Sequence, residues 1–169
     1  LQAKQYVLKS QPSSPCVFVA DQQVSGRGRR ENPWSSVAGK DLLFSAVIES
    51  ELPLSEVHKM ASSTALALAH ALQVYGVQSH VKFPNDLYTN GRKLAGVLIE
   101  QVQEYSLIGI GLNVNSYPTL ETATSLAIEL GREISREELL VAILNQLVQK
   151  VSLCRDHFQG IRDGVAPLD

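Results

Sequence analysis

The sequence predicts one α/β (α+β) domain, in which a mixed sheet carries its helices mainly on one face. Short apolar runs of strand length are separated by turn residues, and two longer segments repeat apolar residues at helical spacing. The 169 residues are enough for one hydrophobic core, and no linker divides them. Strands mixed with hairpins and a few long helices are typical of this class.

The first half of the chain predicts two strands and a helix. Strands are expected over 15–21 and 42–49, which are rich in Val, Phe, Leu and Ile. The connection 22–41 holds glycine, proline and basic residues, and one this long in a compact domain is usually functional or mobile. A helix is expected over 55–75, because apolar residues recur at helical spacing up to Gly76, a normal C-terminal signal.

The second half predicts a hairpin and a final helix. After a strand over 77–83, Asn90-Gly91 predicts a two-residue turn that leads into a strand over 93–102. That strand pairs with a further one over 106–114. Ser135 to Glu138 has the spacing of a capping box, and the apolar residues of 139–151 trace one face of the last helix.

Charge and cysteine usage narrow the function classes. Fifteen Lys and Arg against seventeen Asp and Glu give a net charge of −2, so no overall basic field favours nonspecific nucleic-acid binding. Cys16 and Cys154 lie far apart without a C-x-x-C spacing, which indicates a reducing compartment and no structural zinc. No apolar run approaches the roughly 20 residues of a membrane span. The expected location is the cytoplasm, with no membrane partner.

Three polar clusters indicate an anion-binding site. Gly26 to Arg30 packs three guanidinium groups and two glycines into five residues, with Trp34 just beyond. The second cluster, Lys82 to Asp86, is followed by Lys93 and Gly96, and the third is a glycine-asparagine run over 109–115. A basic loop alone is usually a solvated surface, or a nucleic-acid arm. Three clusters in one domain favour one shared site.

Two common nucleotide motifs are excluded. A phosphate loop ending at Gly39 needs glycine where Trp34 stands, and Ser or Thr where Asp41 stands. A dinucleotide fingerprint that starts at Gly26 needs glycine at the position of Glu31. The anion site is therefore of another kind.

The clusters, in this order, resemble the catalytic domain of the biotin–protein ligases, also called biotin–[acetyl-CoA-carboxylase] ligases, of the monofunctional type. Gln23 to Arg30, continuing to Trp34, matches the family's Gln-x-x-Gly-Arg-Gly-Arg-Arg loop. Lys82 to Asp86 matches Lys-Trp-Pro-Asn-Asp with Phe83 in place of Trp, and Lys93 to Gly96 matches Lys-x-x-Gly. The run over 109–115 matches Gly-x-Gly-x-Asn-x-Asn. The resemblance covers almost the whole chain and implies the fold shared by class II aminoacyl-tRNA synthetases and biotin ligases.

The sequence also departs from the family pattern. Glu31 and Asn32 replace the Gly and Arg that usually follow the double arginine, which lowers the loop's charge. A Ser-Thr-Asn segment of the ureido-ring pocket is expected just before Leu1 and is absent from this sequence. We expect 1–169 to be a single catalytic domain, with neither a DNA-binding domain nor a small C-terminal β-domain, and therefore no DNA partner.

The resemblance implies an ATP-dependent ligase. Biotin and ATP give biotinyl-5′-AMP and pyrophosphate, with Mg²⁺, and a lysine of a biotin carboxyl carrier protein then takes the biotin and releases AMP. Both steps concentrate negative charge, so fixed donors and cations are the main catalytic requirement. The metal ligands and a homodimer are left open.

The resemblance also implies roles for individual residues. Arg29 approaches the α-phosphate, and Lys93 bridges the biotin carboxylate and the phosphate. Lys82 assists at the phosphates, or is a surface lysine. Asp86 accepts the proton of the incoming lysine or helps to hold Mg²⁺, with turn capping as the alternative. Biotin and nucleotide are expected to contact Gln23, Gly26, Arg27, Gly28, Arg29, Arg30, Trp34, Asn85, Lys93, Gly96, Gly111 and Asn113.

Two other functions stay open from the sequence. A lipoate–protein ligase or octanoyl transferase shares the fold and a lysine close to the acyl group. A nonenzymatic module that binds anions or nucleic acid needs only the basic loop, and leaves Lys93, Asn85 and Asn113 without a shared purpose.

Overall fold

The computed structural model describes residues 2–10, 12, 15–29, 32–50, 53 and 55–162, with side chains up to residue 150. The elements are α1 (Gln2–Ser10), β1 (Cys16–Ala20), β2 (Gly26–Arg27), β3 (Pro33–Trp34), β4 (Leu42–Glu49), α2 (Val57–Gln73), β5 (His80–Lys82), β6 (Asp86–Thr89), β7 (Arg92–Val102), β8 (Tyr105–Leu112), α3 (Leu126–Leu130) and α4 (Arg136–Arg162).

Six strands form the main sheet in the order β1-β4-β8-β7-β6-β5. Every pairing in this sheet is antiparallel. The α+β class is confirmed, whereas the parallel component of the predicted mixed sheet is limited, among the described residues, to an isolated bridge between Lys93 and Ala123. The predicted hairpin is present, and Asn90 (φ 48°) and Gly91 (φ 75°) form its turn with the left-handed backbone that such turns need.

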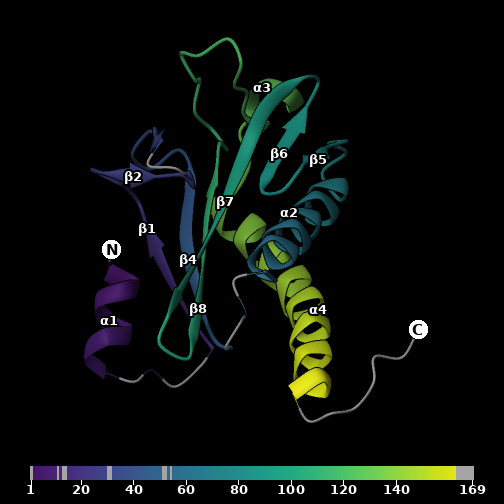
Figure 1. Cartoon of the computed structure of the whole chain (residues 1–169). Coiled ribbons are helices and arrows are strands. Elements are labelled where there is room, and N and C mark those ends of the chain that lie inside the picture. Colours follow the sequence, from purple (N-terminus) through teal and green to yellow (C-terminus); the bar gives the residue numbers. More distant parts are fainter. Residues whose placement is uncertain are drawn as a thin grey trace.

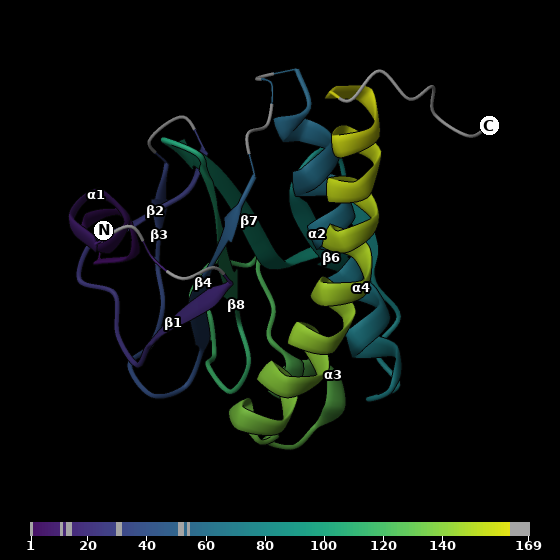
Figure 2. The same cartoon turned by 90° about the horizontal axis from the view of Figure 1, so that it is seen from below.

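Helices α2 and α4 lie together on one face of the sheet, as predicted (Figures 1 and 2). Phe44, Val97, Ile108 and Ile110 face these helices, and with the apolar stripe of α2 they form the larger core. Since side chains alternate along a strand, the residues between them face the other way.

The opposite face carries α1, a helix that the sequence analysis did not predict (Figure 2). Only Ala3 and Val7 of α1 are buried, and they pack against Val47, Tyr105 and Leu107. Two buried residues in nine give too weak a helical pattern to predict the element.

The predicted final helix is confirmed as α4, and Ser135 stands at its N-terminus. The Ser135 hydroxyl accepts a hydrogen bond from the Glu138 amide at 3.1 Å, as a capping serine should. The hydroxyl also donates to Oε2 of Glu137 at 3.1 Å, a contact that is not part of the capping box. The pKa of Glu137 is lowered by a hydrogen bond from its own backbone amide and then by this hydroxyl. Among the helices described, none combines the length and apolarity that a bilayer span requires.

Candidate active site

A pocket of about 560 Å³ lies on the sheet face opposite α2 and α4. Its floor is the outward-facing set of residues on three central strands: Leu43, Ser45, Gly96, Leu98, Gly109 and Gly111. The connection after β1, the start of α1 and the turn between β5 and β6 complete its walls. The volume is in the range of pockets for small molecules and cofactors.

Lys93 enters this pocket from the start of β7. Its Nζ lies 2.9 Å from Oδ2 of Asp86 and 5.6 Å from the centroid of the Trp34 ring. The Lys93 side chain is 32 % exposed, so its charge is partly shielded from water. A cation held between a carboxylate and an aromatic face can be offered to an incoming anion without moving far.

Arg29 connects the first two sequence clusters. Its Nη1 donates to Oδ1 of Asn85 at 3.2 Å, across 56 residues of sequence. Asn85 is itself fixed, since its Nδ2 donates to the Val97 carbonyl at 2.9 Å and the Val97 amide donates back to its carbonyl at 2.8 Å. The basic loop thus reaches the Pro-Asn-Asp turn through a rigid side chain.

Trp34 lies flat against two glycines of the pocket floor. A Cβ atom on Gly111 would stand 2.5 Å from Cε2 of Trp34, and one on Gly96 would stand 3.2 Å from Cζ3. The indole Nε1 is buried and has no hydrogen-bond partner. Gly26 is needed behind the tryptophan, because a Cβ there would lie 2.5 Å from the Trp34 carbonyl oxygen and 2.8 Å from Oε1 of Gln23.

Glu100 is a pocket residue that the sequence analysis missed. Its Oε1 lies 3.8 Å from Nη2 of Arg27 and 3.7 Å from Nζ of Lys4. Strand alternation could have found it, since Gly96, Leu98 and Glu100 all face the pocket. The carboxylate holds Arg27 of the basic loop toward α1.

Most of the predicted site residues come together around this pocket. Its lining includes Gln23, Arg27, Gly28, Arg29, Trp34, Asn85, Asp86, Lys93, Gly96 and Gly111. Gly26 lies behind Trp34, and Arg30 is outside the described residues.

Besides Gly26, two predicted residues, Lys82 and Asn113, do not line the pocket. Lys82 is exposed at the sheet edge, where its Nζ lies 4.8 Å from the centroid of the Tyr88 ring. Asn113 is only 6 % exposed, and its Nδ2 donates to the Thr124 carbonyl at 2.9 Å. The structure thus places Lys82 on the outer edge of the sheet and Asn113 against the backbone of Thr124. The ligand contacts expected of both residues stay predictions from the sequence.

The described residues offer no ready metal site. Among the side chains that the structure describes between 2 and 150, no three His, Cys, Asp or Glu residues gather around a common point. Asp86, the carboxylate expected to help with Mg²⁺, is paired with the Lys93 ammonium. These residues do not form a protein cage for a divalent cation.

Comparison with known proteins identifies the family. The sequence pattern of the biotin/lipoate A/B protein ligase family matches residues 2–115, about two thirds of the chain. This chain belongs to that family. The resemblance that the motifs predicted is thereby confirmed at the level of the family.

The relatives with similar sequences are matched over less than half of their own length. The chain is 33 % identical over 140 residues to the bifunctional ligase/repressor BirA of Bacillus subtilis, across 76 % of this chain and 43 % of BirA. It is 31 % identical over 107 residues to the biotin–[acetyl-CoA-carboxylase] ligase of Mycobacterium tuberculosis, across 60 % of this chain and 40 % of that ligase. A solved structure, the biotin protein ligase from Aquifex aeolicus in complex with biotin and ATP, superposes with a TM-score of 0.80 at 25 % identity. It covers 96 % of this chain and 72 % of that one.

Proposed function

We propose that this chain is the catalytic domain of a biotin–protein ligase. It makes biotinyl-5′-AMP from biotin and ATP, and transfers the biotin to a lysine of a biotin carboxyl carrier protein. The observation that carries the proposal is that Arg29 from the first sequence cluster meets Asn85 and Lys93 from the second at one pocket of suitable size. The similarity to the Aquifex aeolicus ligase with biotin and ATP supports the choice of substrates.

In the first step, a biotin carboxylate oxygen attacks the α-phosphorus of ATP, and pyrophosphate leaves. Two anionic groups must meet, so the Lys93 ammonium lies between them and offsets their repulsion. Asp86, 2.9 Å from Nζ, keeps the ammonium at this place. Arg29 donates to the α-phosphate from its position beside Asn85.

In the second step, the carrier lysine attacks the acyl carbon, the bond from that carbon to the phosphate oxygen breaks, and AMP leaves. The attacking amine must lose a proton, and Asp86 is the pocket carboxylate nearest to Lys93 that can accept it. No covalent bond between the enzyme and the acyl group is required.

The floor of the pocket suits a nucleotide base. Gly96 and Gly111 leave room for a flat group, and in this structure the Trp34 indole occupies that surface. The adenine either displaces the indole or stacks on it. Mg²⁺ is brought by the phosphates of ATP, which usually supply its ligands together with water.

The wider assignments are part of the same proposal. The partner is the carrier domain or subunit of a carboxylase, without DNA. The cytoplasmic location, the single-domain organisation and the open choice between monomer and homodimer stay predictions from the sequence.

Biotin-dependent exchange of labelled pyrophosphate into ATP tests the proposal. Lipoate and octanoate are the matched alternative acids, since ligases for those groups belong to the same family. We expect exchange with biotin and none above background with the other two. Exchange with lipoate alone would assign the chain to the lipoate ligases, and no exchange with any acid would contradict the proposed function. Calorimetry with biotin, alone and with ATP, measures the pocket directly.

A further inference from the structure

The start of β7 has an unusual neighbour at Lys93. Strand β8 ends at Leu112, which pairs with Ala95, so β8 does not reach Lys93. The segment 122–124 takes its place: the Lys93 amide donates to the Thr122 carbonyl at 2.8 Å, and the Thr124 amide donates to the Lys93 carbonyl at 2.9 Å. On its other side Lys93 pairs with Tyr88 of β6, so the segment 122–124 holds one of the two edges of its backbone.

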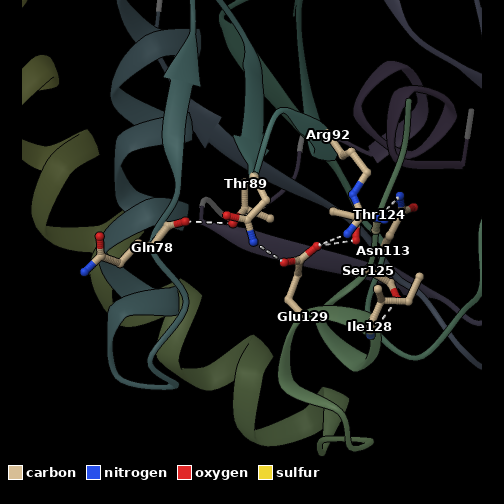
Figure 3. Close-up of polar contacts among 9 residues, drawn as sticks. Gln78, Thr89, Arg92, Asn113, Thr124, Ser125, Ile128 and Glu129 are labelled. Atoms are coloured by element: carbon tan, nitrogen blue, oxygen red, sulfur yellow. Dashed lines mark hydrogen bonds and ion pairs between the residues drawn. The ribbon is translucent and has the colours of Figure 1, made fainter. Parts of the chain in front are cut away.

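A single carboxylate joins this segment to the β6–β7 hairpin. Glu129 of α3 accepts hydrogen bonds from Arg92 Nη2 at 2.9 Å and from the Thr124 hydroxyl at 2.5 Å, both on Oε1 (Figure 3). Its Oε2 accepts from Asn90 Nδ2 at 2.6 Å. The Glu129 side chain is only 7 % exposed, so these contacts are largely shielded from water. They fix the turn, the residue before Lys93 and the segment beside it.

Asn113 fixes the same segment from the other side. Its Nδ2 donates to the Thr124 carbonyl at 2.9 Å (Figure 3). Its own carbonyl accepts from the Leu126 amide at 3.2 Å. Thr124 is thus held by its amide, its carbonyl and its hydroxyl. Little freedom is left where it meets Lys93.

We infer that Glu129 is a positioning residue for Lys93. Glu129 does not line the pocket and acts through the backbone at the start of β7. The inference rests on the proposed function, because the group that it positions is the ammonium that bridges the two substrates.

The variant Glu129→Gln tests this inference. A glutamine that accepts from Arg92 and Thr124 points its amide nitrogen at Asn90, whose own amide must then rotate to accept, and the charge that holds Arg92 is lost. We expect the biotin-dependent exchange rate to fall about 10- to 100-fold, since small displacements of a reacting group have effects of this size. Biotin affinity without ATP should change by less than about two-fold, because Glu129 touches no pocket residue's side chain.

The control is Glu133→Gln, the same change on an exposed ion pair. Glu133 contacts Lys40 at 2.6 Å, and both side chains are about half exposed. Exchange by this variant should stay within about two-fold of the unchanged protein. A loss as large as that of Glu129→Gln would overturn the inference.

A double-mutant cycle separates positioning from general weakening of the fold. If Glu129 acts through Lys93, Glu129→Gln should change the residual rate by less than about two-fold in a Lys93→Ala background. An equal loss in both backgrounds would contradict the inference. The pair Asn90→Asp with Glu129→Gln should recover most of the rate, since the new carboxylate accepts from the glutamine amide and aspartate also tolerates the left-handed turn.

Thr124→Val keeps the test available if Glu129→Gln does not fold. It removes one donor to the carboxylate and retains the side-chain shape, so we expect a smaller loss that also disappears in the Lys93→Ala background.

The exchange rate of the unchanged protein distinguishes a failure of the proposed function from a failure of the positioning role. Absence of exchange in that protein would count against the proposed function, whereas normal exchange that Glu129→Gln and Thr124→Val do not alter would count against the positioning role alone.

Discussion

Lys93 and Lys82 have different surroundings in the structure, although they lie close together in the sequence. Both lysines flank the Pro-Asn-Asp turn in the sequence, and both were expected at the phosphates. Lys93 points into the pocket beside Asp86, while Lys82 lies on the outer edge beside Tyr88. Charge neutralisation falls with distance in water, so we expect Lys93 to contribute more at the phosphates than Lys82.

Replacing these two lysines gives a matched test. We expect Lys93→Ala to lower biotin-dependent pyrophosphate exchange by about 100-fold or more, as for the loss of one donor to a developing charge. Lys82→Ala should lower it by less than about three-fold, because an exposed lysine that contacts one aromatic face contributes little. Similar losses in both variants would mean that Lys82 moves to the phosphates when substrates bind.

The sequence analysis could identify the residues of the site better than their orientation. Motifs predicted that Arg29, Asn85, Asp86 and Lys93 belong together, and the pocket brings them together. They could not show that Asn113 turns inward to hold Thr124, because Asn113 follows the end of β8, where strand alternation no longer sets which way a side chain faces. Glu100 was missed because no motif contains it. Strand alternation does indicate it, since Glu100 lies on the same face of β7 as Gly96.

At the scale of elements, the pair β2 and β3 is the least predictable part of the fold. Each strand has two residues, with Gly26 opposite Trp34 and Arg27 opposite Pro33, so no alternation can indicate them. The Gly28 amide closes the turn by donating to the Asn32 carbonyl at 2.7 Å. The pair is stabilised by tertiary contact, namely the indole of Trp34 against Gly96 and Gly111.

Trp34 is the only tryptophan in the chain, so its fluorescence reports this contact directly. In Gly111→Ala the new methyl group would lie 2.6 Å from Nε1, which forces the indole off the sheet into water. We expect its emission to move to longer wavelength.

The matched control for this fluorescence measurement is Gly109→Ala on the same strand. A Cβ at Gly109 meets the Leu98 carbonyl at 3.3 Å and does not meet Trp34. Its emission should stay as in the unchanged protein. Identical spectra for all three proteins would contradict the placement of the indole.

For the whole molecule, the sequence analysis predicted the strands and long helices and could not predict how they assemble. Apolar runs and the Asn90-Gly91 turn are local signals, and they are confirmed as β1, β4, β7, β8 and the hairpin. The sheet order depends on pairings between distant segments, such as β4 with β8, which no local pattern specifies. Helices α1 and α3 are short, and packing rather than pattern holds them in place.

One hydrogen-bond network joins the connection 22–41 to the segment that follows β8. Asp41, only 1 % exposed, accepts from the Val37 amide at 2.8 Å, from the Val114 amide at 3.0 Å and from the Ser116 hydroxyl at 2.5 Å. Arg136, at the start of α4, donates to the Asp41 carbonyl at 3.2 Å and pairs with Asp21. The connection 22–41 is thus held at both ends. The segment after β8 binds Asp41, and Arg136 of α4 contacts both Asp41 and Asp21.

Asp41→Ala tests this anchoring. It leaves the buried Val114 amide, the partly buried Val37 amide and the Ser116 hydroxyl without an acceptor, so we expect the free energy of unfolding, measured by urea titration, to fall by about 2–4 kcal/mol. Asp21→Asn is the control, since Asp21 is 83 % exposed and its pairing with Arg136 should be worth less than about 1 kcal/mol. Asp41 anchors the connection 22–41, whereas α2 and α4 pack on the other face of the sheet. In Asp41→Ala this connection should therefore become accessible to protease at urea concentrations where α2 and α4 are still folded. Loss of the connection and the helices in one transition would instead mean that Asp41 stabilises the whole domain and not the pocket wall.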